Sequence, residues 1–327
     1  MTFRDSKGLD YKDVLLVPQH SDIPSRSDVY IGSWLTPNID LAVPVVSANM
    51  DTITNVDVAW AMALEGSAGI LHRYASPLEV HGWVGKLKAL KKSSHLHGDL
   101  YVIPSIGVGD DQVEIAKQYL DLGADAINID IAHGDSKAMV DTIRKLVNSQ
   151  HDYVDLIVGN IATPEAARRL IGEGAMTVKV GIGPGAVCDT RKKTGAGYPQ
   201  LSAIMEIAPI VHELDGCLIA DGGIREVGDC VKALAAGADT VMSGFLFKGS
   251  AESHCRTYRG MASNEAQRDF KGFAKNIEGH SEVIESGGTI LEIMKGIREG
   301  IQSGFSYCGS RTITELHENA EFVIIRS

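Results

Sequence analysis

One glycine-rich segment ends in a cysteine that has the chemistry of a nucleophile. Residues 179–195 read KVGIGPGAVCDTRKKTG, in which three glycines and a proline precede Cys188. Such a backbone is irregular, and its amides and carbonyls can turn toward a ligand or a cation. A thiol becomes strongly nucleophilic when oriented amides or neighbouring cations favour its thiolate form, and Arg191, Lys192 and Lys193 follow closely. Taken alone, the segment is equally compatible with a glycine-rich turn and an inert buried cysteine.

A second motif has the residue types of an anion and sugar site. In IADGGI, residues 219–224, an apolar run ends in Asp221 and continues into two glycines. Glycine amides at the start of a helix bind anions, and a carboxylate accepts hydrogen bonds from sugar hydroxyls. An acid that only complements the dipole of the following helix is the alternative interpretation of Asp221. Gly244, two residues after another apolar run, is placed to complete an anion cradle.

Further polar residues follow other apolar runs, and each is a weak signal by itself. They are Ser47 to Asp51, which include Met50, then His72 with Arg73, Asp130, His133 with Gly134, and Asn160. His133 is more typical of a hydrogen-bonded structural residue than of a base. The histidines show no metal-like spacing, so we predict no catalytic transition metal.

Eight short apolar runs predict the strands that must position these residues, and helical patterns at 112–122, 164–173 and 225–236 lie between them. The runs are 44–46, 68–71, 101–106, 126–131, 155–158, 177–180, 217–220 and 240–242. Eight such units predict an α/β fold, the (β/α)8 TIM barrel, whose active site lies at the carboxyl ends of its strands. Cys188 then lies on the catalytic face. An open doubly wound sheet is the alternative, but no strand-Gly-x-Gly-x-x-Gly-helix opening occurs early in the chain.

Local repetition and two long connections support the barrel. Three helical patterns end in Gly-Ala, at 123, 174 and 237, and each leads directly into an apolar run. We expect a catalytic loop at about 181–200 and a long, mobile, flap-like loop at about 250–287, both over the catalytic face. Because no linker or composition break is visible, we expect residues 1–327 to form a single catalytic domain.

Composition excludes several classes of function. With 31 basic and 42 acidic residues the formal charge is −11, which disfavours a nucleic-acid partner. The longest apolar run, residues 58–64, is far shorter than the ~20 residues that a membrane-spanning helix needs, so no membrane partner is expected. No secretory signal is visible, and the five scattered cysteines form no C-x-x-C pair. We therefore expect a cytoplasmic protein without disulfides.

Seven motifs together resemble the family that contains IMP dehydrogenase and GMP reductase. In chain order they are GLDYKDVLLVP, SANMDT, DIAHG, GN-x-x-T-PE, KVGIGPG-x-VC-x-TR, ADGGIR and Y-x-GMAS. The resemblance covers nearly the whole chain. It implies a barrel that binds a purine nucleotide and a nicotinamide cofactor, with Cys188 attacking purine C2 to make a covalent thioimidate.

Several features are similar to the reductase branch of this family. The stretch after Cys188 is reductase-like, no regulatory CBS domains are inserted after the second strand, and residues 260–297 lack the Arg-Tyr pair that dehydrogenases use to activate water. Residues 275–279, KNIEG, resemble the reductase loop whose glutamate pairs with a threonine. The resemblance thus implies Cys188, Thr190 and Glu278 as catalytic residues and a reductive deamination of GMP to IMP with NADPH.

Further assignments follow from the resemblance alone. Implied substrate-binding residues are Asp221 at the ribose, Gly222, Gly223 and Gly244 at the phosphate, Met261 and Ser263 at the base, and Met50. Asp130 and Arg73 are implied on the cofactor side. The carbonyls of Gly183, Gly185 and Cys188 match the family's potassium site, and the family is tetrameric.

Three departures from the family pattern concern the phosphate pocket: Ala186 replaces Ser, Asp189 replaces Thr or Ile, and Phe245 replaces Ser or Gly. A lost hydroxyl removes a phosphate hydrogen bond, a bulky ring crowds the same oxygen, and an added carboxylate repels it. We hypothesise a remodelled phosphate pocket. An IMP dehydrogenase, and a nucleotide-binding barrel with little turnover, remain the alternative functions.

Overall fold

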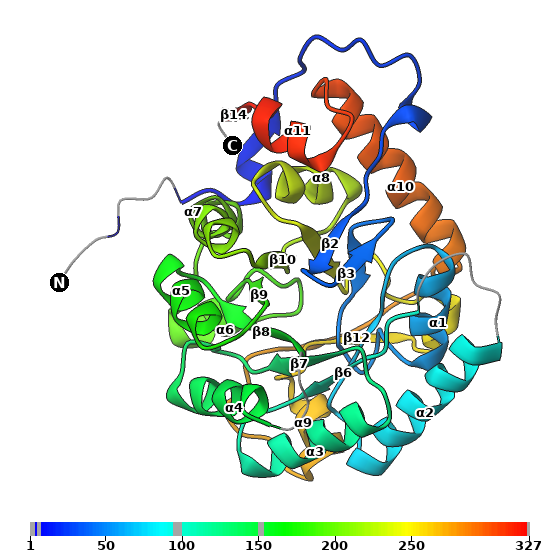
Figure 1. Ribbon diagram of the computed structural model, residues 1–327, viewed down its shortest axis with the longest axis vertical. Coiled ribbons are helices and arrows are strands. Elements are labelled where there is room, and N and C mark those ends of the chain that lie inside the picture. The colour runs from blue at the N-terminus through cyan, green and yellow to red at the C-terminus, as the bar shows by residue number, and fades with distance from the viewer. Residues whose placement is uncertain (1–3, 5–7, 94–99, 150–153, 326–327) are drawn as a thin grey trace.

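Eight parallel strands form the centre of the molecule in a computed structural model, which describes residue 4 and residues 8–93, 100–149 and 154–325 (Figure 1). In spatial order they are β4 (Val45–Ser47), β11 (Thr240–Ser243), β10 (Cys217–Asp221), β9 (Thr177–Val180), β8 (Asp155–Ile161), β7 (Ala126–Asp130), β6 (Ile103–Ile106) and β5 (Ile70–Leu71). A parallel bridge between Ser47 and Gly69 joins the two ends of this order. The predicted (β/α)8 barrel is therefore confirmed, and each of the eight predicted runs overlaps one barrel strand.

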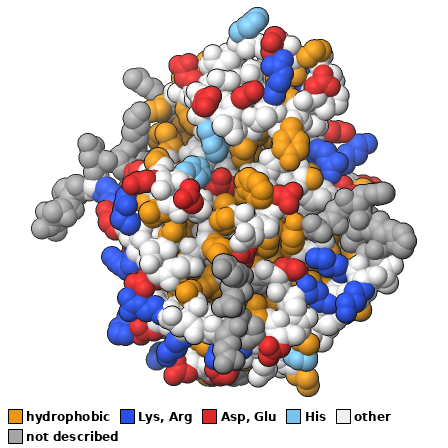
Figure 2. All heavy atoms as spheres, in the orientation of Figure 1, with side chains coloured by type: hydrophobic (Ala, Val, Ile, Leu, Met, Phe, Trp, Pro, Cys, Tyr) orange, Lys and Arg blue, Asp and Glu red, His pale blue; other side chains and the backbone are white. Residues whose placement is uncertain are grey.

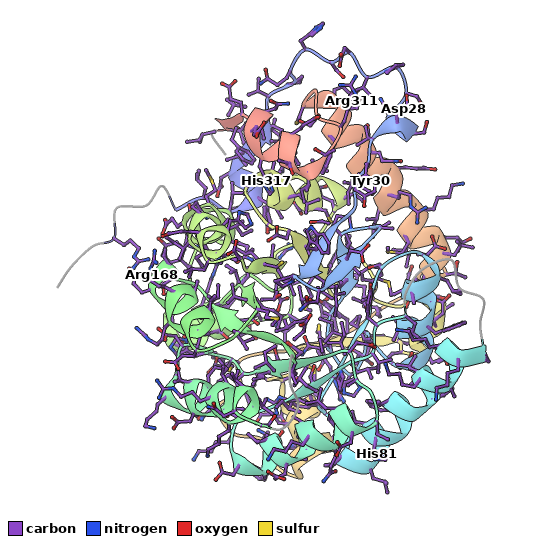
Figure 3. The ribbon with its side chains drawn as sticks, in the orientation of Figure 1. Asp28, Tyr30, His81, Arg168, Arg311 and His317 are labelled. Atoms are coloured by element: carbon purple, nitrogen blue, oxygen red, sulfur yellow. The ribbon has the colours of Figure 1, made fainter. Side chains whose placement is uncertain are left out.

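Helices surround the barrel and connect its strands. They are α1 (Val56–Leu64), α2 (Pro77–Ser93), α3 (Asp110–Asp121), α4 (Lys137–Val147), α5 (Pro164–Gly172), α7 (Gln200–Glu213), α8 (Val227–Ala235) and α10 (Ile290–Tyr307). Polar side chains lie on their outer faces, and Arg168 on α5 and His81 on α2 extend away from the barrel in Figure 3. Acidic and basic side chains intermingle on the face shown in Figure 2.

The repeated Gly-Ala exits have a common physical cause. Gly123, Gly174 and Gly237 have φ angles of 88°, 107° and 109°, which glycine adopts without steric strain at the end of a helix. Where an aspartate follows, its carboxylate accepts a hydrogen bond from a backbone amide close to the start of the neighbouring strand: Asp125 from Val102 and Asp239 from Leu218. At these three positions the Gly-Ala pair thus ends a helix and leads into the next strand.

A hairpin closes the amino end of the barrel. It consists of β2 (Ser33–Thr36) and β3 (Ile39–Leu41), whose Leu35, Ile39 and Leu41 are buried against strand residues inside the barrel. The Thr177 hydroxyl donates to the Leu35 carbonyl at 2.8 Å. The sequence pattern did not predict these short strands. Because this hairpin fills the amino end of the barrel, we expect a ligand site at the carboxyl end.

The two long connections differ in content. The first contains one short helix, α6 (Thr190–Thr194). The second, expected as a flap-like loop at about 250–287, contains four short elements: η3 (Ala251–Ser253), β12 (Thr257–Arg259), α9 (Asn264–Lys271) and β13 (Ser281–Val283). Antiparallel pairing of β12 with β13 folds the connection back on itself. These strands have three residues each, too few for period-two alternation to reveal them.

Two segments far apart in the sequence pair near α8. Strand β1 (Val14–Leu16) pairs antiparallel with β14 (Phe322–Ile324), and α11 (Ile313–Asn319) lies next to them, so that blue and red segments adjoin in Figure 1. Two 3-10 turns, η1 (Tyr11–Asp13) and η2 (Arg26–Asp28), complete the amino-terminal region. Within the described residues, no helix combines the length and apolarity needed to cross a membrane.

Candidate active site

A cavity of about 280 Å³ opens at the carboxyl ends of the barrel strands. Residues that follow six of the barrel strands line it, together with residues on both sides of α9. The predicted site residues in its lining are Met50, Arg73, Asp130, Gly183, Gly185, Cys188, Thr190, Asp221, Gly222, Gly244, Met261 and Glu278. Only Gly223 and Ser263 of the predicted set are outside this lining, so the structure brings together residues separated by most of the chain.

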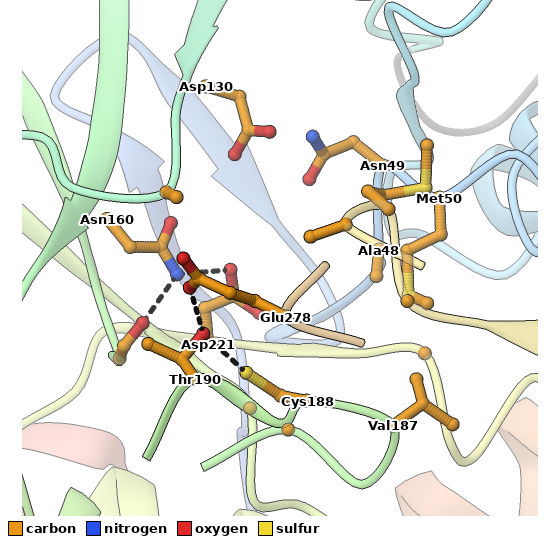
Figure 4. A pocket seen from close by; sticks show the side chains of 18 of the residues that line it. Ala48, Asn49, Met50, Asp130, Asn160, Val187, Cys188, Thr190, Asp221 and Glu278 are labelled. Carbon is orange, nitrogen blue, oxygen red and sulfur yellow. Dashed lines mark hydrogen bonds between the residues drawn. The ribbon is translucent and has the colours of Figure 1, made fainter. Parts of the chain in front are cut away.

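A chain of hydrogen bonds joins the three predicted catalytic side chains (Figure 4). The Cys188 thiol donates to the Thr190 hydroxyl over 3.3 Å, and that hydroxyl donates to Oε2 of Glu278 over 2.8 Å. The order thiol, hydroxyl, carboxylate is the direction in which a proton leaves a nucleophile for a base. The arrangement can therefore activate the thiol and hold a proton close to a reacting atom.

Backbone contacts hold the loop of Cys188 against the segment that carries Glu278. Cys188 forms an antiparallel bridge with Gly279. The Asp189 amide donates to the Glu278 carbonyl at 2.7 Å, and the His280 amide donates to the Val187 carbonyl at 3.2 Å. The connection after β11 thus completes the site that begins after β9.

The cations that follow Cys188 do not surround its thiol. Arg191 turns back, where its guanidinium contacts Asp10 at 3.2 Å and the Tyr198 carbonyl, and Lys192 pairs with Asp189. The close approach of Arg191 explains Gly183, because a Cβ atom there would lie 2.5 Å from the Arg191 Cγ. These cations organise the loop, and Thr190 is the side-chain partner of the thiol.

A buried lysine links two acidic residues of the cavity. Lys179 extends from β9, and its Nζ lies 2.6 Å from Asp130 and 3.4 Å from Asp221. Burial by itself would raise the pKa of Asp130, but the charges of Lys179 and Arg73 outweigh burial and lower it. Burial would likewise lower the pKa of Lys179, yet the two carboxylates raise it. Asp130 and Lys179 are therefore both charged at neutral pH.

The side chain of Asn160 orients Asp221. Its Nδ2 donates to Oδ2 of Asp221 and to the Gly181 carbonyl, both at 2.9 Å (Figure 4). Lys179 also contacts Oδ2, so Asn160 and Lys179 both leave the other carboxylate oxygen, Oδ1, available for a ligand hydroxyl. The arrangement favours a hydrogen-bonding role for Asp221 over that of a helix-dipole acid.

Of the glycines predicted at the phosphate, Gly222 and Gly244 line the cavity. Gly222 and Gly223 have φ angles of 97° and 80°, and a Cβ atom on Gly222 would lie 2.9 Å from Pro184. A Cβ on Gly244 would lie 2.7 Å from the Met50 sulfur and 3.2 Å from the Tyr258 hydroxyl. Gly223 faces a neighbouring cavity lined by Tyr11 and Pro184. Neighbouring groups therefore approach the backbone of Gly222 and Gly244 too closely for a larger residue.

Two of the three departures from the family pattern, Asp189 and Phe245, were expected to face the cavity but do not line it. Asp189 is bonded to the Nδ1 of His280 at 3.0 Å and to Nζ of Lys192 at 3.1 Å, and it is absent from the cavity lining. Phe245 is also outside the lining, with its ring edge-on to Tyr258 and the Lys248 Nζ 3.6 Å from its centroid. Both side chains thus have partners outside the cavity lining, and their expected effects on a bound phosphate stay predictions.

The remaining predicted residues occupy varied positions. Arg73 donates from Nε to the Asp130 carbonyl at 3.0 Å, and no described acceptor contacts its terminal nitrogens. Met261 lines the cavity, whereas Ser263 is fully buried and caps α9 by accepting from Ala266. His133 is exposed and outside the lining.

The predicted potassium site has the right donor chemistry. Potassium is a hard cation that prefers oxygen ligands, and the carbonyl oxygens of Gly183 and Cys188 accept no hydrogen bond from the described residues. The Gly185 carbonyl accepts from the Cys188 amide at 3.1 Å and keeps one lone pair. Over the same described part of the chain, no group of three or more His, Cys, Asp and Glu side chains has metal-binding geometry.

Sequence reasoning missed Lys179, Tyr258 and the partner of Asp189. Lys179 stands within the apolar run 177–180, and a lysine in a buried strand is itself a signal because it needs a carboxylate partner. Tyr258 lines the cavity beside Gly244, and burial raises the pKa of its hydroxyl. His280 is close to Glu278 in sequence, but nothing in the sequence pairs it with Asp189.

Comparisons with known proteins agree with this geometry. Residues 8–327 match the family model described as the IMP dehydrogenase / GMP reductase domain. Inosine-5'-monophosphate dehydrogenase from Borreliella burgdorferi is 33% identical over 385 residues, covering 98% of this chain and 94% of that protein. GMP reductase from Onchocerca volvulus is 33% identical over 341 residues, covering 98% of this chain and 92% of that protein.

A solved structure is also similar over nearly the whole chain. A GMP reductase variant from Trypanosoma brucei, crystallised with guanosine 5'-monophosphate, has a TM-score of 0.92 at 27% identity, covering 98% of this chain and 96% of that one. Relatives named for the two activities are equally similar in sequence. Choosing between the activities therefore depends on the residues of the site.

Proposed function

Because the chain belongs to the family of IMP dehydrogenases and GMP reductases, we propose that it is a GMP reductase that converts GMP to IMP and ammonia with NADPH. The hydrogen bond between Thr190 and Glu278, next to the Cys188 thiol, carries this proposal. A carboxylate at this place can manage the proton of a departing amine. The absence of an Arg-Tyr pair from residues 260–297 points the same way.

The first step uses Cys188 as a nucleophile. Its proton passes through the Thr190 hydroxyl to Glu278, and the thiolate forms a bond to C2 of the purine. Thr190 and Glu278 then return a proton to the C2 amino group. The C2–N bond breaks, ammonia leaves, and a thioimidate remains on Cys188. A covalent intermediate divides one difficult displacement into two easier steps, and protonation makes ammonia a viable leaving group.

The second step reduces the same carbon. NADPH, when bound, would supply the hydride that C2 needs. Cys188 would then leave C2 as a thiolate, taking the electron pair of the C–S bond, and IMP would be released. Asp130 and Arg73 are the residues assigned to the cofactor. The terminal nitrogens of Arg73 are available to an anionic group at the edge of the cavity.

Nucleotide binding is assigned to a second set of residues, most of which line the same cavity. Asp221, oriented by Asn160 and Lys179, accepts hydrogen bonds from the ribose hydroxyls. The amides of Gly222, Gly223 and Gly244 bind the phosphate, and Met50, Met261 and Ser263 are assigned to the base. The carbonyls of Gly183, Gly185 and Cys188 would hold a potassium ion, whose charge would stabilise the irregular loop. Tetrameric assembly remains a prediction.

An IMP dehydrogenase is the second candidate, since relatives with that name are equally similar. One experiment separates the two. Purified protein is incubated with GMP and NADPH, and in parallel with IMP and NAD⁺, while the near-ultraviolet absorbance of the reduced cofactor is followed. We expect absorbance to fall with GMP and NADPH, and Cys188→Ala to abolish the change. A rise with IMP and NAD⁺ instead would assign the dehydrogenase. Silence in both assays would favour a binding protein with little turnover.

A further inference from the structure

A side-chain contact outside the cavity joins the two loops that carry the catalytic residues. The Nδ1 of His280 lies 3.0 Å from Oδ2 of Asp189. Asp189 stands between Cys188 and Thr190, and His280 is two residues beyond Glu278. Among the described residues, this is the one side-chain hydrogen bond besides that of Thr190 and Glu278 that connects residues 181–200 with residues 250–288.

The surroundings hold the Asp189 side chain in one orientation. The other oxygen of Asp189, Oδ1, accepts from Lys192 at 3.1 Å, and the second nitrogen of His280 lies 3.3 Å from Glu282. Asp189 is only 15% exposed in its side chain, whereas His280 is 39% exposed. The hydrogen bond from His280, followed by that from Lys192, lowers the pKa of Asp189 and keeps it ionised. A charged acceptor with both oxygens engaged has little freedom to turn toward the cavity.

The contact matters because Glu278 belongs to a segment outside the barrel. Two backbone hydrogen bonds anchor this segment locally. The Glu278 amide donates to the Ala262 carbonyl, and the Gly260 amide donates to the His280 carbonyl, both within the same connection. These bonds shape the connection but do not attach it to Cys188. The segment is attached to the Cys188 loop by the two backbone hydrogen bonds of the bridge between Cys188 and Gly279. The contact of Asp189 with His280 adds a side-chain attachment.

We propose that Asp189 and His280 are positioning residues, which hold the Glu278 carboxylate within hydrogen-bonding distance of Thr190. The inference rests on the proposed function, since Glu278 is the group whose position matters. It also gives a reason for Asp189, because an apolar residue at this position cannot accept a hydrogen bond from His280. Misplacing a catalytic group by about 1 Å costs up to roughly 100-fold in rate.

The test compares Asp189→Ala, Asp189→Asn, His280→Ala and the control Glu282→Gln in the full chain. With GMP and NADPH we expect kcat to fall roughly 10-fold to 100-fold in the two alanine variants, with KM for GMP within about twofold. Asparagine keeps an acceptor for His280 and should restore most of kcat. Glu282→Gln changes the other neighbour of His280 and should stay within about twofold. In a Glu278→Gln background, Asp189→Ala should have no further effect, which a general loss of structure would not produce.

A second readout does not depend on turnover. Amide hydrogen exchange of residues 276–283 in the protein without nucleotide should be faster in Asp189→Ala than in wild type or Glu282→Gln. Unchanged exchange would overturn the inference, as would an unchanged kcat or an equal loss in Glu282→Gln. Wild-type protein inactive toward GMP would instead overturn the proposed function, and exchange would still test the contact.

Discussion

The Thr190 hydroxyl donates a 2.8 Å hydrogen bond to Glu278, a residue 88 positions later in the chain. Thr190 stands in the loop after the sixth barrel strand, β9, and Glu278 in the connection after the eighth, β11. With Cys188 as the donor to Thr190, the three side chains form a path for one proton.

We expect Thr190→Val to lower kcat for GMP roughly 10²-fold to 10⁴-fold, the usual contribution of a positioned acid or base. Valine keeps the shape of threonine but removes the hydroxyl that joins thiol and carboxylate. Steady-state kinetics would check this, with Thr194→Val as a control on the exposed end of α6. Combining Thr190→Val with Glu278→Gln should cost little more than either change alone. Additive losses would show that the two residues act separately.

Replacing the buried lysine should destabilise the protein. Lys179→Met leaves Asp130 and Asp221 without their shared cation, and removing one partner of a buried ion pair costs about 3–5 kcal/mol. Urea denaturation would measure the free energy of unfolding, with the exposed Lys193→Met as the matched control. An unchanged unfolding free energy would mean that the carboxylates take up protons or solvent at no cost.

His72 should make stability depend on pH. Burial lowers its pKa to about 4 from the ordinary value of 6.5, and its ring contacts Trp83 edge-on. Between pH 6.5 and 4 the unfolded chain takes up a proton that the folded protein excludes, so the free energy of unfolding falls as pH falls. The loss attributable to His72 reaches about 3 kcal/mol near the lower limit. His72→Gln should flatten the profile over this interval, and parallel profiles for both proteins would contradict the assignment.

Lys248 should contribute to phosphate binding. Its Nζ lies over the Phe245 ring and 5.9 Å from the centroid of Tyr258, which lines the cavity beside Gly244. We expect Lys248→Ala to raise KM for GMP severalfold, and salt to reduce the difference, because partly exposed charges are screened. Lys248→Arg keeps the charge and should behave like wild type. An effect of Lys248→Ala on kcat alone would exclude a phosphate role.

The sequence by itself determined the barrel and the order of its polar strand ends. Apolar runs and the Gly-Ala exits are local signals, because strand burial and a positive φ after a helix depend on residues close in the chain. Since parallel strands end at one face, their order also predicted that Cys188, Asp221 and Asp130 would meet. The motifs that resemble the family led to Thr190 and Glu278 in the same way.

Only the tertiary structure decided which side chains contact one another within that face. Asp189 turns to His280 instead of the cavity, Lys179 lies between two carboxylates, and the β2–β3 hairpin fills the amino end of the barrel. Each contact joins residues from different elements. Their geometry depends on how the connection after β11 packs on the loop after β9, and on which partner a buried charge finds. No periodicity within either segment encodes that choice.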